Sequence, residues 1–132
     1  GRTDMLPGVV GSQLVKVFDL EIGKTGLNGS DAAREGIACE TAVTRWRSRA
    51  GYYPGVREIT VTLTKNASTD EVIGGEVAGT DGAALRANVL AAAVTAKMKI
   101  PDLAYLDLGY APPFAPVWDP LNAAAQSLMR RG

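Results

Sequence analysis

The side chains best suited to chemistry in this sequence are three tyrosines: Tyr52 and Tyr53 in the stretch RAGYYPG, and Tyr110 at the start of YAPPF. A phenol hydroxyl can donate or accept a hydrogen bond and can act as a general acid. Adjacent residues of an extended chain point to opposite sides, so one of Tyr52 and Tyr53 can pack while the other presents its hydroxyl. The sequence leaves open which one does so. Taken alone, a Tyr-Tyr-Pro turn is explained more simply as a hairpin lid.

Most other catalytic chemistries lack their residues here. The sequence contains no histidine, which removes histidine triads, histidine metal sites and the commonest general base at neutral pH. Its one cysteine, Cys39, lies in a strand-like context and is expected to be a buried apolar side chain. There is no C-x-x-C pair, dinucleotide-binding glycine fingerprint or phosphate loop. Asp19, Glu21 and Asp107 show no spacing typical of metal ligands, so we assign no metal site.

The tyrosine at position 110 begins an unusual segment, residues 110–122, which reads YAPPFAPVWDPLN. Pro112 and Pro113 fix φ and lack N–H groups, so this segment should run extended and stiff. Its end, Asp119 followed by Pro120, is a helix start, because aspartate can cap and proline suits the first helical position. We call residues 110–118 the arm, and expect it to press aromatic side chains against another surface.

Composition limits the class of protein. A chain of 132 residues with 46% hydrophobic content can form one domain with a single core. Lys+Arg and Asp+Glu both number 14, so no overall charge favours nucleic acid or an anionic membrane. No apolar run reaches membrane-spanning length and no signal-peptide pattern opens the chain. A lone cysteine fits a reducing compartment, and we expect a cytoplasmic protein with neither nucleic-acid nor membrane partners.

The elements that must position these residues follow from periodicity and turn signals. Alternating apolar residues predict strands at residues 14–22, 39–47, 56–64 and 71–78. A bulge or close backbone approach is expected at Gly74 and Gly75. Cap and breaker residues predict helices at 31–35, capped by Ser30, at 82–98, capped by Asp81, at 101–106 and at 120–130. Strands followed by helices predict an α+β fold of two layers, a mostly antiparallel sheet packed with helices.

Several separated pieces of the chain carry a family resemblance: GSQLVKVFDL at 11–20, TGL at 25–27, RAGYYPG at 49–55, DGAALR at 81–86 and LDLGYAPPFAPVWDPLN at 106–122. In this order they resemble the C-terminal dimerisation domain of FAD-dependent pyridine nucleotide-disulfide oxidoreductases. The branch it most resembles contains the coenzyme A disulfide reductases and NADH oxidases. The glutathione-reductase-like branch carries a catalytic His-Glu pair in this domain, which a sequence without histidine cannot supply.

This resemblance implies a set of roles. Residues 1–10 would be the linker from a missing upstream FAD-binding domain, and 11–130 the dimerisation domain. FAD and NAD(P)H would be bound by the upstream domains, with none expected on this chain alone. Tyr110, with Tyr52 or Tyr53, would support catalysis in trans by reaching the partner subunit's flavin and redox cysteine. The homodimer interface would involve Leu108, Phe114, Trp118 and Leu121.

The intact enzyme would reduce coenzyme A disulfide, a persulfide or polysulfide, or oxygen, and neither the acceptor nor the choice between NADH and NADPH can be read from these residues. An alternative of another class is a stand-alone α+β module that binds a ligand or a protein without redox activity. The reading frame upstream of Gly1 would discriminate between the two.

Overall fold

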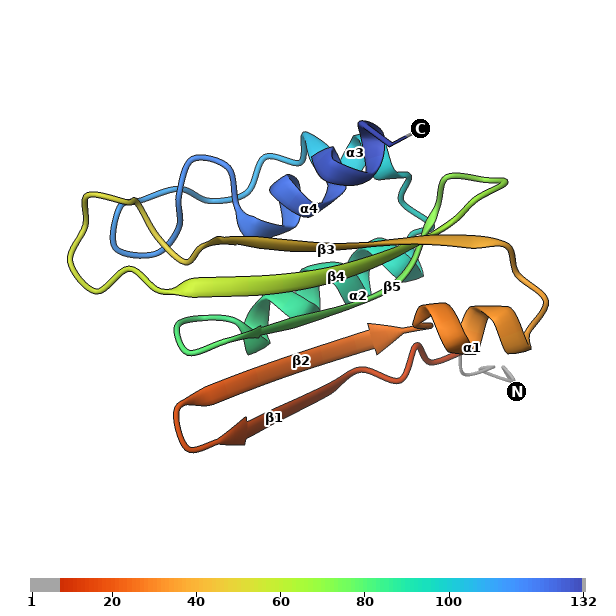
Figure 1. The fold of residues 1–132 in the computed structure, drawn as a ribbon, viewed down its shortest axis with the longest axis horizontal. Coiled ribbons are helices and arrows are strands. Elements are labelled where there is room, and N and C mark those ends of the chain that lie inside the picture. The colour runs from red at the N-terminus through yellow and green to blue at the C-terminus, as the bar shows by residue number, and fades with distance from the viewer. Residues whose placement is uncertain (1–7, 132) are drawn as a thin grey trace, which may run out of the picture.

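The computed structural model describes residues 8–131, which form a five-stranded antiparallel sheet with helices (Figure 1). The strand order is β1-β2-β5-β4-β3. The strands are β1 Gln13–Val17, β2 Leu20–Gly26, β3 Cys39–Arg47, β4 Glu58–Asn66 and β5 Val72–Gly79. The helices are α1 Gly29–Arg34, the 3-10 turn Ala84–Arg86, α2 Ala87–Thr95, α3 Ile100–Ala104 and α4 Pro120–Met129. The linker expected at residues 1–10 falls mostly on residues 1–7, which lie outside the described part.

One face of the sheet carries the core. Along β4, Ile59, Val61 and Leu63 are fully buried, as their alternation with threonines predicts. Helix α2 packs on β2 and β5, and α4 packs on β3 and β4. Leu90 of α2 and Leu128 of α4 join the β4 residues in one apolar cluster, so both helices cover the same face. The α+β prediction of two layers is therefore confirmed, with the helices α2 and α4 lying along the strands (Figure 1).

The first expected strand, residues 14–22, is wrong as a single element, because it is a hairpin. Strands β1 and β2 pair antiparallel through a turn at Phe18 and Asp19, with Val17 opposite Leu20. Phe18 has a φ of 52° and is 94% exposed at the tip. A two-residue hairpin turn needs positive φ, which glycine or asparagine usually supplies. Phe18 is not a residue typical of such a turn, so the sequence did not predict that the chain reverses direction there.

The cap expected for the long helix is also wrong. Its regular part is only Ala87–Thr95, preceded by the 3-10 turn Ala84–Arg86. Asp81 accepts hydrogen bonds from Arg49 instead of capping, and Glu21 of β2 accepts the bond from the Ala84 backbone N–H at 3.1 Å. The carboxylate that the local sequence assigned to the helix is therefore bound by a charged partner in the turn after β3.

Two other expectations concern helix starts and a glycine pair. Helix α1 is capped by Asn28, whose side chain accepts the Asp31 N–H, and not by Ser30 as expected. Helix α4 begins as predicted, with Asp119 as N-cap and Asn122 completing a capping box. A close approach is confirmed at Gly74, where an added Cβ would overlap the Leu27 backbone, and the β4–β5 register shifts beside it.

Candidate functional site

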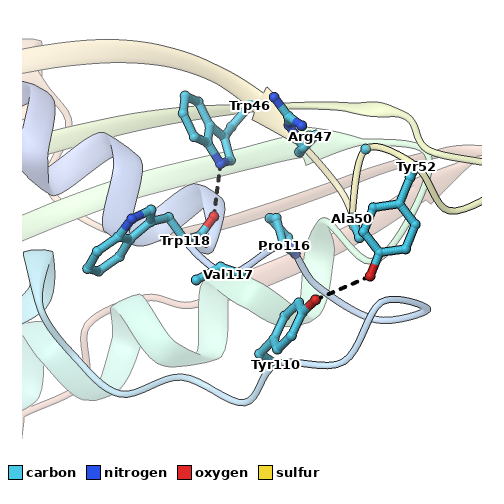
Figure 2. Close-up of a pocket in the computed structure, with 9 residues that line it drawn as sticks. Trp46, Arg47, Ala50, Tyr52, Tyr110, Pro116, Val117 and Trp118 are labelled. Carbon is cyan, nitrogen blue, oxygen red and sulfur yellow. Dashed lines mark hydrogen bonds between the residues drawn. The ribbon is translucent and has the colours of Figure 1, made fainter.

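The turn after β3 and the arm meet at one end of the sheet and enclose an open groove of about 280 Å³ (Figure 2). Two of the three candidate tyrosines, Tyr52 and Tyr110, lie on its wall. The remaining wall residues are apolar except for one cation: Trp46, Arg47, Ala50, Gly51, Pro116, Val117 and Trp118. The groove is therefore largely apolar, with two phenol hydroxyls and the Arg47 guanidinium as its polar side-chain groups. A mostly apolar wall with a few polar groups is the usual composition of a small-molecule site.

The structure distinguishes the two adjacent tyrosines. Tyr52 is 78% exposed and its hydroxyl oxygen lies 3.5 Å from that of Tyr110. Tyr53 is half-buried, and the Arg49 guanidinium carbon lies 5.8 Å from the centre of its ring. Tyr53 thus packs in its own subunit while Tyr52 presents its hydroxyl, an alternation that the sequence predicted without naming the members.

The phenol pair is close but not tightly bonded. An oxygen–oxygen distance of 3.5 Å is longer than an ordinary O–H···O hydrogen bond, so a small rotation frees either hydroxyl for a ligand. The hydrogen bond with Tyr52, then burial and the charge of Tyr52, raise the pKa of Tyr110 above 10.0. Tyr110 therefore remains protonated at neutral pH and can act as a hydrogen-bond donor.

Backbone contacts hold the turn beside the arm. The Ala50 N–H donates to the Pro112 carbonyl at 3.3 Å. The Trp46 indole N–H at the end of β3 donates to the Trp118 carbonyl at 2.9 Å, as Figure 2 shows. The Trp118 ring also packs edge-on against Tyr105, with centroids 6.3 Å apart. Trp46 and Arg47 were not predicted as wall residues, because a strand pattern carries no sign of the distant segment that its end will meet.

The four residues expected at a subunit interface have different surroundings. Phe114 is 78% exposed and Trp118 is 45% exposed, so both offer apolar surface to another molecule. Leu108 is half-buried and packs against the core. Leu121 is fully buried in the core of its own chain. Leu121 therefore has no surface with which to contact a partner in this conformation.

The three arginines near the groove do not share one role. Arg45 and Arg47 are exposed on β3, with Arg45 Nε 3.9 Å from Glu58 Oε1. Arg49 donates from Nε and Nη2 to the two oxygens of Asp81 at 2.9 and 2.7 Å. Burial alone would raise the pKa of Asp81, but hydrogen bonds from Arg49 and Ser48 and the charges of Arg49 and Arg86 lower it below 3.8.

Residues 8–131 contain neither a cluster of metal-ligating side chains nor a membrane-spanning helix. Across residues 8–131, no three histidine, cysteine, aspartate or glutamate side chains gather in a way that could hold a metal ion. Over the same span, no helix has the length and apolarity needed to cross a membrane.

Comparison with known proteins identifies the family. Residues 12–120 match the family described as "Pyridine nucleotide-disulphide oxidoreductase, dimerisation domain", and the chain belongs to it. The family resemblance stated from the motifs is thereby confirmed.

Individual relatives agree with this assignment. The chain is 41% identical, over 97% of its length, to the NAD(P)H sulfur oxidoreductase (CoA-dependent) of Pyrococcus furiosus. It is 32% identical, over 93% of its length, to the NADH oxidase of Methanocaldococcus jannaschii. These alignments cover 29% and 27% of the two relatives, so the chain spans less than a third of their length.

A solved structure extends the likeness to the fold. The NAD-dependent persulfide reductase from A. fulgidus superimposes with a TM-score of 0.92 and 36% identity, covering 96% of this chain and 24% of that one. The comparisons give no support to the alternative of a stand-alone binding module.

Proposed function

We propose that this domain joins two copies of a flavin-dependent NAD(P)H oxidoreductase and completes the partner subunit's active site with Tyr110 and Tyr52. The acceptor would be coenzyme A disulfide, a persulfide or polysulfide, or oxygen. The support from known proteins is the dimerisation-domain match and relatives whose names specify CoA-dependent sulfur reduction and NADH oxidation.

One observation carries the proposal for the tyrosines. Tyr52 and Tyr110 are 58 positions apart in the chain, yet their hydroxyls meet at the mouth of an open groove. A purely structural pair of phenols would be expected to lie inside the core with its hydrogen bonds made. Here Tyr52 is 78% exposed and Tyr110 is 48% exposed, so both hydroxyls can reach a group outside the subunit.

The chemistry that these residues can perform is donation to sulfur. A protonated phenol can hydrogen-bond a thiolate and give its proton to a leaving thiolate, which is the task that histidine performs elsewhere. The ordinary pKa of a tyrosine, 10.0, already leaves the phenol protonated at neutral pH, and the pKa of Tyr110 is raised from that value. FAD and NAD(P)H would supply hydride and electron transfer when bound, and we propose that upstream domains of the same polypeptide bind them.

Association would use the exposed apolar side chains beside the groove. Phe114 and Trp118 are the proposed contacts, together with the half-buried Leu108. A permanent dimer buries a largely apolar surface, which fits these side chains better than the charged parts of the domain. The single free thiol, Cys39, suits a reducing compartment, and we propose the cytoplasm as the location.

Conservative tyrosine variants in the full-length protein test the proposal. Tyr110→Phe and Tyr52→Phe each remove one hydroxyl and keep the ring. Because a positioned acid contributes about 10²-fold or more, kcat with coenzyme A disulfide should fall by about that factor for Tyr110→Phe. Tyr53→Phe is the matched control, since Tyr53 packs beneath Arg49. Equal activity in all three variants would contradict the assignment.

A further inference from the structure

Arg86, near the groove, donates hydrogen bonds to residues that are far apart in the sequence. Its side chain is 12% exposed and its guanidinium donates to four separate segments. The acceptors are Asp119 Oδ2 at 3.0 Å, the Gly82 carbonyl at 2.7 Å, the Ser48 carbonyl at 3.2 Å and the Phe114 carbonyl at 3.4 Å. Arg86 thus combines a salt bridge to Asp119 with three backbone carbonyl acceptors.

Two of these acceptors belong to the segments that carry the groove tyrosines. Ser48 lies four residues before Tyr52, and Phe114 lies four residues after Tyr110. One guanidinium nitrogen, Nη2, contacts both carbonyls, so it lies between the turn and the arm. The Ala50 N–H also donates to the Pro112 carbonyl at 3.3 Å, so the two segments share one direct backbone bond beside the contacts of Arg86.

The orientation of the guanidinium is itself fixed. Asp119 is 10% exposed in the ion pair and accepts the Leu121 backbone N–H with its other oxygen, as the N-cap of α4. The carboxylate is thus tied to the core helix, and it fixes the plane of the Arg86 fork. Only arginine can serve here, because lysine has no rigid fork and cannot reach acceptors in four directions at once.

We propose that Arg86 is the positioning residue that sets Tyr52 and Tyr110 at their mutual distance. It touches neither ring and acts through the Ser48 and Phe114 carbonyls. Both tyrosines are too exposed for packing to fix them, so their separation depends on where the two backbones are anchored. The link to catalysis rests on the proposed function, whereas the geometric effect does not.

The geometric effect can be measured on the 132-residue chain with ¹³C-labelled tyrosine. The ring protons beside the two hydroxyls should give a nuclear Overhauser effect between Tyr52 and Tyr110. In Arg86→Lys, which keeps the charge beside Asp119, we expect this signal to be lost while circular dichroism remains unchanged. The control is Lys65→Met, which breaks a different ion pair, between the buried Lys65 and Asp70, at the end of β4 away from the groove.

The outcomes are distinct. A retained signal in Arg86→Lys, or an equal loss in Lys65→Met, would overturn the positioning role. If Arg86→Lys does not fold, Asp119→Asn decides, because asparagine also caps helices but lacks the charge that orients the guanidinium. A signal of wild-type intensity in that variant would then overturn the proposal, and a weakened one would support it.

Kinetics of the full-length protein separate this inference from the proposed function. We expect Arg86→Lys to lower kcat roughly 10- to 100-fold, because a displacement of about 1 Å can cost about 10²-fold. The KM for NAD(P)H should not change, because that ligand would bind upstream. An unchanged kcat alongside a lost Tyr52–Tyr110 signal would refute the catalytic consequence. A wild-type protein without reductase activity would refute the proposed function and leave the signal to decide the geometry.

Discussion

The ion pair between Arg49 and Asp81 should make the stability of this domain depend on pH in the acid range. It joins the turn that carries Tyr52 to the loop before α2, and both side chains are less than a third exposed, at 21% and 28%. The perturbation is Asp81→Asn, which keeps the shape and one acceptor oxygen but removes the charge. A hydrogen bond to a charged group contributes about 1.5–3 kcal/mol, so we expect a loss of about 2 kcal/mol at pH 7.

The sign of the pH dependence follows from the lowered pKa of Asp81. A group whose pKa is lower in the folded state stabilises the protein above its unfolded value, here 3.8. That contribution is lost as the pH falls through the folded pKa. The difference in unfolding free energy between wild type and Asp81→Asn should therefore be full at pH 7 and should shrink towards zero below pH 3.8.

Urea denaturation at fixed protein concentration provides the assay. With an m-value of about 2 kcal/mol/M, a loss of about 2 kcal/mol lowers the midpoint by about 1 M. Asp107→Asn is the control, since Asp107 is exposed on the loop before the arm. A midpoint difference for Asp81→Asn that is as large at acid pH as at pH 7 would refute the electrostatic reasoning and indicate a change in packing.

Three further predictions concern stability. Leu121→Ala should lower the free energy of unfolding, measured by denaturation, by about 3–5 kcal/mol because Leu121 is fully buried. Phe114→Ala should leave unfolding of the monomer unchanged and weaken self-association, measured by sedimentation, because Phe114 is exposed. Gly74→Ala should destabilise more than Gly109→Ala, because its Cβ would overlap the Leu27 backbone while nothing lies within 4 Å at Gly109. The hydrogen bond from Lys65 to Asp70 raises the Lys65 pKa, although burial opposes this. The stability that the pair contributes should therefore be present below pH 10.5 and be lost as the pH rises through the raised folded pKa. Equal loss of stability at alkaline pH in Lys65→Met and wild type would contradict this.

The sheet and the last helix could be predicted because their signals are local. The alternation of Ile59, Val61 and Leu63 with threonines specifies a strand with one buried face. Asp119 followed by Pro120 specifies a helix start. These patterns depend on neighbours within a few positions, and no tertiary contact overrides them.

The errors occurred where distant residues or backbone strain decide the outcome. Phe18 adopts a positive φ at a hairpin tip, a conformation that the sequence preferences of phenylalanine do not indicate. Asp81 binds Arg49 across 32 positions instead of capping the helix that follows it. Likewise, the sequence identified a pair of candidate tyrosines but could not choose Tyr52, because the choice depends on where Tyr110 and Arg49 lie in space.

The most direct test of in trans catalysis is subunit complementation in the full-length protein. Tyr110→Phe subunits would be mixed, unfolded and refolded with subunits in which the redox cysteine that we propose lies upstream has been replaced by serine. If Tyr110 serves the partner's site, each mixed dimer contains one site with both an intact cysteine and an intact Tyr110, and activity should return. If Tyr110 serves its own subunit, every site in the mixed dimer lacks one of the two groups. Activity that stays at the level of the separate variants, in a sample shown to contain mixed dimers, would contradict the account.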